Sequence, residues 1–255
     1  MHLSCSGKTP IRKHKDREKI YLIYQYFIPK DEARKKELQT CLKFNADNPH
    51  IDTVYLLNEK IYSKGELGIE NDKIKQINIT TRLKFKDVFK FVNTEQLKGY
   101  IVMCNSDIFF DNTIDSLRKS TLSQNKQVLC QLRFEYTDKK LGKCKLFGPR
   151  ADSQDAWMFH SNNNPIKALS AFNFVFGHPG CDNKLIYLFH VLGFEVFNDP
   201  FFIKTYHNHQ TDQRNYGLDL LHKPYMLISP FIHGQNIHNQ TDIWGTVGYR
   251  LLKTH

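Results

Sequence analysis

The sequence predicts a single α/β domain built on a mainly parallel central sheet with helices on both sides. Apolar segments of strand length alternate with segments of helical periodicity through the first half of the chain, and the links between them are short. The 255 residues, 40% of them hydrophobic, are enough for one large core. Because no repeat or linker divides the chain, we expect a basic tail over residues 1–19 and one domain over residues 20–255.

The order of the expected elements follows from their hydrophobic periodicity. Strands are expected at residues 20–27, 52–57, 75–80, 100–104, 127–136, 156–160 and 195–198. Helices are expected from Asp31 to just before Pro49, behind Arg82, and over residues 182–192, where Gly193 follows. Repeated strand–helix–strand units imply right-handed crossovers, and the ligands of such sheets bind at the carboxyl ends of the strands.

Composition limits the classes of function. The net charge is +10, from 36 basic and 26 acidic residues, which suits an anionic ligand such as a nucleotide, a nucleic acid or an anionic surface. The longest apolar runs are far shorter than the roughly 20 residues of a membrane-spanning helix. The six cysteines are scattered without a CxxC pair, which favours reduced thiols. We therefore expect a soluble, cytoplasmic protein.

A polar triplet interrupts the apolar stretch YIVMCNSDIFFDNT, residues 100–113. Asn105, Ser106 and Asp107 follow the strand at 100–104, so they are expected on the ligand-binding edge of the sheet. A carboxylate there can bind a hard divalent cation that bridges a diphosphate. The alternative is that Asp107 only caps a turn, as Asp often does at strand ends.

Two further segments carry candidate site residues. In FGHPGCDN, residues 176–183, a glycine-rich loop that allows close approach of a ligand leads to Asp182 at the start of a helix, where the carboxylate is either catalytic or a helix N-cap. His207 and His209 share one face if the strand continues. Such a pair can lie near a metal, although polar surface residues are the commoner explanation.

In their order and spacing, these segments resemble the GT-A class of nucleotide-sugar glycosyltransferases, particularly the small soluble enzymes of large DNA viruses or bacteria. The resemblance covers residues 20–217. The segment 104–107 resembles the DxD-type motif that binds a divalent metal and the donor diphosphate, with Asn105 in place of its first Asp. His207 matches the C-terminal His that completes the metal site in several of these families.

Segment 176–183 is similar to the glycine-rich loop and Glu-Asp pair of inverting members. Cys181 stands in the place of the Glu, and Asp182 in the place of the catalytic Asp. Arg82 resembles the Arg that contacts the nucleotide.

The resemblance implies a metal-dependent transfer of a sugar from a nucleoside-diphosphate donor, with UDP favoured, to a hydroxyl of a glycan or other acceptor. Mn²⁺ or Mg²⁺ would be held by Asp107, His207 and His209, and inversion would follow from Asp182 acting as base, its carboxylate kept ionised by the helix N-terminus. Further expected donor-side residues are Asn58, Arg82, Asn105, Ser106, Lys204 and Arg214.

Asp155 is the second candidate for the base or a ligand of the donor sugar, and Trp157 is either a sugar platform or a core residue. Two other hypotheses for the function stay open: a metal-dependent phosphoesterase or nuclease using the same ligands, and a non-enzymatic nucleic-acid-binding module. Under the preferred hypothesis, a glycosyltransferase, we expect no nucleic-acid partner and no membrane span.

Overall fold

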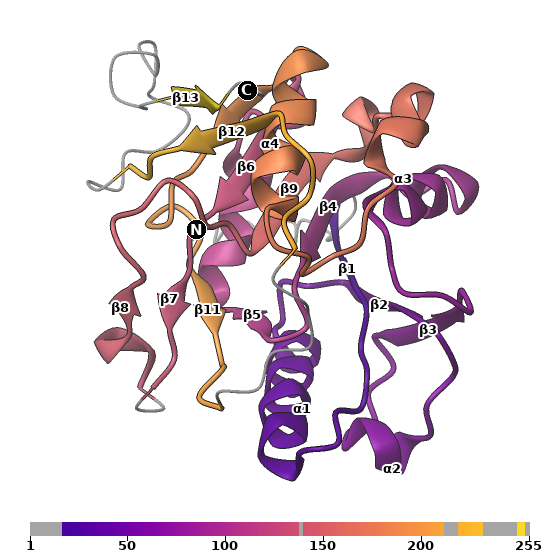
Figure 1. Cartoon of the computed structure of the whole chain (residues 1–255). Helices are drawn as coiled ribbons and strands as arrows, with labels where there is room; N and C mark the ends of the chain where they lie inside the picture. Colours follow the sequence, from indigo (N-terminus) through magenta and orange to yellow (C-terminus); the bar gives the residue numbers. More distant parts are fainter. Residues whose placement is uncertain (1–16, 138–139, 212–218, 232–248, 253–255) are drawn as a thin grey trace, which may run out of the picture.

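A seven-stranded sheet organises the protein (Figure 1). The computed structural model describes residues 17–137, 140–211, 219–231 and 249–252. The strand order is β10-β6-β9-β4-β1-β2-β3. The bounds are β1 Lys19–Tyr24, β2 Thr53–Asn58, β3 Ile74–Asn78, β4 Gly99–Cys104, β6 Gln127–Gln131, β9 Ala156–His160 and β10 Glu195–Phe197. Only β9 runs antiparallel to its neighbours β4 and β6, so the predicted mainly parallel sheet is confirmed.

The α-helices cover both faces of this sheet. They are α1 Glu32–Asp47, α2 Lys64–Leu67, α3 Phe85–Thr94 and α4 Cys181–Val191. Shorter 3₁₀ segments are η1 Asn112–Lys119, η2 Leu141–Lys143, η3 Ser161–Asn163 and η4 Ile166–Phe172. Asp31 caps α1 as predicted, because its side chain accepts a hydrogen bond of 2.7 Å from the backbone N–H of Arg34.

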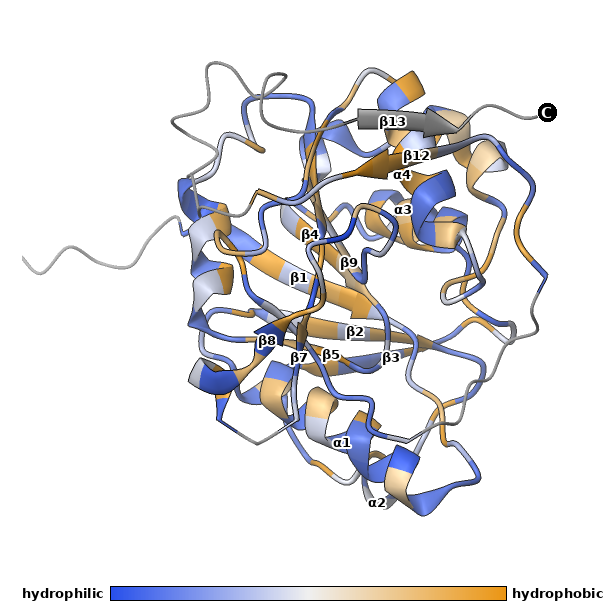
Figure 2. Cartoon of the chain, turned by 60° about the vertical axis from the view of Figure 1, so that its left-hand side comes forward, coloured by the Kyte–Doolittle hydropathy of each residue, from blue (hydrophilic) through white to orange (hydrophobic). Residues whose placement is uncertain are grey.

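Strand β1 shows why the core has two halves. Its consecutive residues Leu22 and Ile23 point to opposite faces and are both fully buried, Leu22 packing with α1 and η1 and Ile23 with α3 and α4. In Figure 2 the central strands are largely hydrophobic, with α1 and α2 on one side and α3 and α4 on the other. Trp157 of β9 lies inside the half shared with α3, which confirms its core alternative and leaves no sugar platform there.

A second, four-stranded sheet has the order β5-β11-β7-β8. Its bounds are β5 Ile108–Phe110, β7 Phe134–Glu135, β8 Lys145–Leu146 and β11 Thr205–His207. The predicted strand 127–136 is therefore two strands, β6 and β7, in different sheets. The predicted strand 20–27 ends at Tyr24, and β11 ends at His207, so His209 lies beyond the strand.

Helix α4 begins at an unusual cap. Gly180 is the N-cap, with a left-handed φ of 80°, and a Cβ there would lie 2.8 Å from the hydroxyl of Tyr225. Asp182 therefore lies inside the first turn, and its N-cap alternative is wrong. This glycine makes room for Tyr225, the first residue of β12 Tyr225–Ile228, which pairs with β13 Tyr249–Leu252.

Three other expectations concern the ends of the chain, the membrane and the thiols. Most of the expected tail 1–19 lies outside the described residues, and its last residue begins β1. In the described ranges, no helix is long and apolar enough to cross a membrane. Cys41, Cys104, Cys130 and Cys181 are buried thiols.

Candidate functional site

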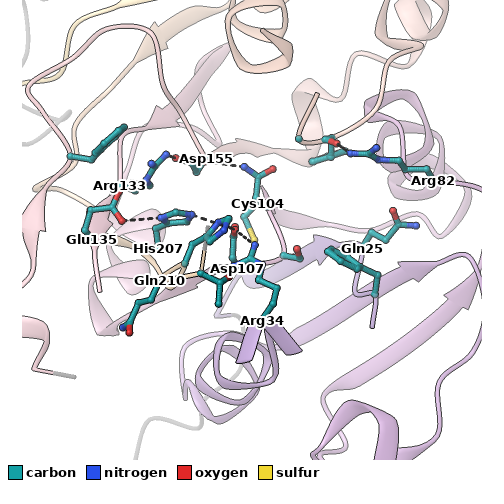
Figure 3. Close-up of a pocket in the computed structure, with 18 of the residues that line it drawn as sticks. Gln25, Arg34, Arg82, Cys104, Asp107, Arg133, Glu135, Asp155, His207 and Gln210 are labelled. Carbon is teal, nitrogen blue, oxygen red and sulfur yellow. Dashed lines mark hydrogen bonds and ion pairs between the residues drawn. The ribbon is translucent and has the colours of Figure 1, made fainter. Parts of the chain in front are cut away.

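A cavity of about 640 Å³ opens at the carboxyl ends of the central strands (Figure 3). Residues that follow β1, β2 and β4 line it, together with residues from the second sheet and from the loop before α4. Its lining includes these residues expected from the sequence: Arg82, Asn105, Ser106, Asp107, Asp155, His207 and His209. A cavity therefore lies at the edge of the sheet where the sequence predicted the site.

Asp107, His207 and His209 converge at one point of this cavity. Nε2 of His207 and Nδ1 of His209 each lie 3.3 Å from Oδ2 of Asp107. One ligand atom from each of the three residues lies within 4.8 Å of the other two. This spacing is suited to a single metal ion shared by one carboxylate and two imidazoles.

The second sheet creates this convergence. β5 starts directly after Asp107, and β11 pairs with it antiparallel so that His207 stands opposite Ile108. Just beyond β11, the backbone N–H of Asn208 donates to the carbonyl oxygen of Asp107 at 2.9 Å. Residues 100 positions apart in the sequence are thus held by backbone hydrogen bonds on both sides of the candidate metal ligands.

The electrostatics around these three residues favour an ionised Asp107 and a protonated His207. Burial alone would raise the pKa of Asp107, but His207, His209 and Arg34 outweigh it and hold that pKa well below its usual range. Burial would likewise lower the pKa of His207, but Asp107 and Glu135 raise it from 6.5 to about 9. Without a metal, His207 is therefore an imidazolium at neutral pH.

Glu135 and Arg133 form part of the site and were not expected from the sequence. Oε2 of Glu135 lies 2.9 Å from Nδ1 of His207, so both ring nitrogens of this histidine face a carboxylate. Arg133 in turn pairs with Glu135 and with Asp155, each at 2.7 Å. Glu135 belongs to β7, and Arg133 directly precedes this strand. The sequence predicted only the end of a longer strand there, and nothing in the local pattern marked the two residues.

Arg34 and Glu37 were also missed, although the sequence held a signal for them. Nη2 of Arg34 lies 2.5 Å from Oδ2 of Asp107, and Nη1 lies 2.8 Å from Glu37. Both residues are buried on the face of α1 that also buries Leu38 and Leu42. Two charged residues on an apolar helical face are the pattern that could have identified them.

Asn105 contacts Asp155, not the metal cluster. Its side-chain Nδ2 donates to Oδ1 of Asp155 at 2.9 Å, while Arg133 pairs with the other carboxylate oxygen. The segment 104–107 therefore contributes one residue, Asp107, to the candidate metal ligands. Asn105 instead fixes Asp155 on the wall of the cavity, which Ser106 also lines.

Asp182 lies behind this wall. It is not part of the cavity lining in the described part of the chain, and its Oδ2 accepts a hydrogen bond of 3.2 Å from the backbone N–H of Gln154. Burial raises the pKa of Asp182 to about 7, and hydrogen bonds from backbone N–H groups oppose that rise only in part. The expectation that the helix N-terminus would lower its basicity is wrong, because desolvation is the larger effect.

Arg82 lies at the opposite end of the cavity from His207, near Gln25 (Figure 3). Its Nη2 donates to the carbonyl oxygen of Phe176 at 3.0 Å. Gly177, which follows, also lines the cavity, so the glycine-rich loop approaches the site at this position. Phe27 and Phe176 add aromatic surface to the lining.

Three expected donor-side residues are not placed in the cavity. Asn58 is fully buried; its Oδ1 accepts from the N–H of Tyr26 at 2.8 Å and its Nδ2 donates to Gln76, so this amide joins strands and cannot contact a nucleotide. Lys204 is absent from the described lining, and its backbone N–H is bound to Thr113. Arg214 lies outside the described residues.

The donor set fits a divalent transition metal such as Mn²⁺. A carboxylate and two imidazoles converge, and imidazole nitrogen is a poorer ligand for Mg²⁺ than oxygen is. Arg34 and the His207 proton neutralise Asp107 in the metal-free arrangement, so a cation would have to displace that proton.

Comparisons with known proteins give distant structural similarity only. No protein-family model and no curated protein sequence matches the chain. A 4-diphosphocytidyl-2C-methyl-D-erythritol synthase from Anaerococcus prevotii aligns with a TM-score of 0.42 and 14% identity, covering 71% of this chain and 87% of that one. A cytidylyltransferase from Leptospira borgpetersenii aligns with a TM-score of 0.46 and 13% identity, covering 79% and 81%.

A protein from Desulfovibrio desulfuricans, provisionally named a nucleotide-diphospho-sugar transferase, aligns with a TM-score of 0.44 and 11% identity, covering 70% of this chain and 78% of that one. Similarity at this level does not identify a reaction. The chemistry of the site, and not the fold, bears on the function.

Proposed function

We propose that this protein is a metal-dependent glycosyltransferase that moves a sugar from a nucleoside-diphosphate donor, UDP in the first instance, to a hydroxyl acceptor. The observation that carries the proposal is the convergence of Asp107, His207 and His209 in a cavity at the carboxyl ends of parallel strands. The cavity, about 640 Å³, falls within the size range of small-ligand sites. The resemblance of the sequence to the GT-A class agrees with both features.

The donor side of the reaction rests on residues of the cavity. When bound by Asp107, His207 and His209, a divalent cation supplies Lewis-acid stabilisation of the negative charge that develops on the departing diphosphate. Arg82, at the other end of the cavity, supplies a positive charge for the nucleotide or its phosphates. Asp155, fixed by Asn105 and Arg133, offers a carboxylate edge to hydroxyl groups of the donor sugar.

Asp182 is the better candidate for the base. A pKa of about 7 allows a carboxylate to accept a proton effectively at neutral pH. Asp155 is less suited, because its carboxylate is engaged by Arg133 at 2.7 Å and by Asn105 at 2.9 Å. For Asp182 to act, its carboxylate must reach the acceptor from behind the part of the cavity wall that Asp155 forms. In-line attack from the side opposite the diphosphate then gives inversion.

The test uses Asp107→Ala, with Asp72→Ala as the control, because Asp72 is exposed on the link to β3. Wild type and control should cleave or transfer from a UDP-sugar in the presence of Mn²⁺, and Asp107→Ala should not. Unchanged activity of Asp107→Ala would remove the metal assignment.

The same assay separates the other two classes of function. Manganese-dependent cleavage of DNA, RNA or a simple phosphodiester, with UDP-sugars left intact, would support a phosphoesterase. Strongly salt-dependent nucleic-acid binding that survives Asp107→Ala would support a binding module.

A further inference from the structure

The segment 208–211, the wall segment, lies directly after β11. It carries His209 and forms one wall of the cavity through Gln210 and Thr211. It has left the second sheet, so strand pairing no longer fixes it. Asn208 still bonds to the carbonyl oxygen of Asp107, and the side chain of Gln210 bonds to the carbonyl oxygen of Tyr136. The largest set of hydrogen bonds to the segment comes from the buried face of α1.

Glu37 of α1 is the centre of that attachment. Its Oε1 accepts hydrogen bonds from two successive backbone N–H groups, Gln210 at 2.8 Å and Thr211 at 3.1 Å. Its Oε2 accepts from the hydroxyl of Thr211 at 3.3 Å. The backbone carbonyl of Glu37 also accepts from Nδ2 of Asn208 at 3.2 Å. One buried carboxylate thus binds both residues that follow His209.

Arg34 connects this attachment to the metal cluster. Nη1 of Arg34 lies 2.8 Å from Oε2 of Glu37, and Nη2 lies 2.5 Å from Oδ2 of Asp107. The Arg34 Nη1 atom additionally donates to the carbonyl oxygen of Asn208 at 3.4 Å. Charge-assisted bonds of this kind are the stronger class of hydrogen bond, particularly when buried. Such bonds connect the wall segment to Glu37, Glu37 to Arg34, and Arg34 to Asp107.

We propose that Glu37 is a positioning residue for the metal centre. Glu37 positions His209 and the wall segment, and its carboxylate neutralises Arg34 beside the cation. This inference rests on the proposed function, because it assumes a cation at Asp107, His207 and His209. Glu37 itself does not line the cavity in the described part of the chain, so it acts only through its neighbours.

Replacing Glu37 with Gln has two effects of the same sign. The amide retains one acceptor oxygen, but its NH₂ group must face either Arg34 or the N–H groups of the wall segment, all of which are donors. In addition, the positive charge of Arg34 is no longer balanced next to the cation. Both effects weaken metal binding. Removing Arg34 is less informative, because it would take away a positive charge that disfavours the cation and, at the same time, a contact that positions Asp107.

The experiment measures Mn²⁺ affinity by electron paramagnetic resonance for wild type, Glu37→Gln and the matched control Glu32→Gln. Glu32 lies on the same helix and is exposed, paired only with Lys35 among the described residues. We expect Glu37→Gln to bind Mn²⁺ roughly 10- to 100-fold more weakly, the range typical of residues that orient metal ligands. Glu32→Gln should bind as wild type does.

The visible spectrum of bound Co²⁺ distinguishes positioning from a purely structural role. If Glu37 places His209, the spectrum of Glu37→Gln saturated with Co²⁺ should differ from that of wild type. A lower Tm with unchanged Mn²⁺ affinity and an unchanged Co²⁺ spectrum would overturn the inference while leaving the proposed function intact. If wild type itself binds no metal, both proposals are overturned.

Thr211→Val keeps the proposal testable if Glu37→Gln does not fold. This change removes only the hydroxyl donor to Glu37 and leaves the buried Arg34–Glu37 pair in place. A weakening of Mn²⁺ binding of about threefold is expected, corresponding to the loss of one modest hydrogen bond. Wild-type affinity and an unchanged Co²⁺ spectrum in Thr211→Val would count against the attachment.

Discussion

His207 gives the metal-free protein a stability that depends on pH. Its pKa rises from 6.5 to about 9 in the folded state, because Asp107 and Glu135 flank its two ring nitrogens and outweigh burial. A group whose pKa is raised by folding stabilises the fold fully below its unfolded pKa. That stabilisation is then lost as pH rises through the folded pKa.

The size of the effect follows from the shift. A shift from 6.5 to about 9 is worth roughly 3 kcal/mol at about 1.4 kcal/mol per pKa unit, and the side chain is only 11% exposed, so solvent screening is small. With EDTA present, the free energy of unfolding should therefore fall by an amount of this order between about pH 6 and about pH 10.

Denaturant unfolding of wild type and His207→Gln across this range measures the effect. The difference between the two proteins is the quantity of interest, because other groups, such as Asp182, change the stability of both alike. The difference should shrink as pH rises through about 9. A difference that stays constant with pH, or grows, would refute the assigned charge state.

Manganese should reverse this dependence. A metal-bound imidazole has lost its proton, so the apparent affinity for Mn²⁺ should rise roughly tenfold per pH unit between about pH 6 and about pH 8. Binding that does not change with pH would show that His207 is not a ligand.

The remaining predictions concern the base, the nucleotide end and the cap of α4. Asp182→Asn should keep donor binding but lose transfer by roughly 10²- to 10⁴-fold, and the wild-type kcat should rise with pH through about 7; a parallel loss of donor binding would indicate a structural role. Arg82→Ala, which also loses the bond to Phe176, should raise the KM for a UDP-sugar about tenfold with a smaller effect on kcat, as steady-state kinetics can show. Gly180→Ala should lower the free energy of unfolding by about 1–3 kcal/mol, because its φ is 80° and its Cβ would meet Tyr225, and the loss should be smaller in a Tyr225→Phe background.

The sequence predicted the sheet and the edge on which the site lies. Buried strands such as β1 and β4 are apolar on both faces, and the polar residues that follow them stand out clearly, as Asp107 does. Asn58 is the last residue of β2, yet its amide is buried, bonded to Tyr26 just beyond β1 and to Gln76 of β3. Position at a strand end therefore indicates the correct edge of the sheet but not whether a side chain faces the cavity or the interior.

The network around the candidate metal ligands could not be predicted in the same way. Glu135 reaches His207 only because β7 leaves the main sheet and pairs with β11. The pKa of Asp182 depends on how deeply tertiary packing buries it, which the helix N-terminus alone does not reveal. Ion pairs between distant segments depend on strand pairing, and local periodicity contains no information about them.

The proposed reaction requires that Asp107, His207 and His209 together hold one divalent cation. Calorimetric titration of Mn²⁺ into wild type and Asp107→Asn near neutral pH tests this claim. The predicted result is one ion bound per wild-type chain and no measurable binding to Asp107→Asn. Equal binding by the two proteins, or none by wild type, would contradict the claim.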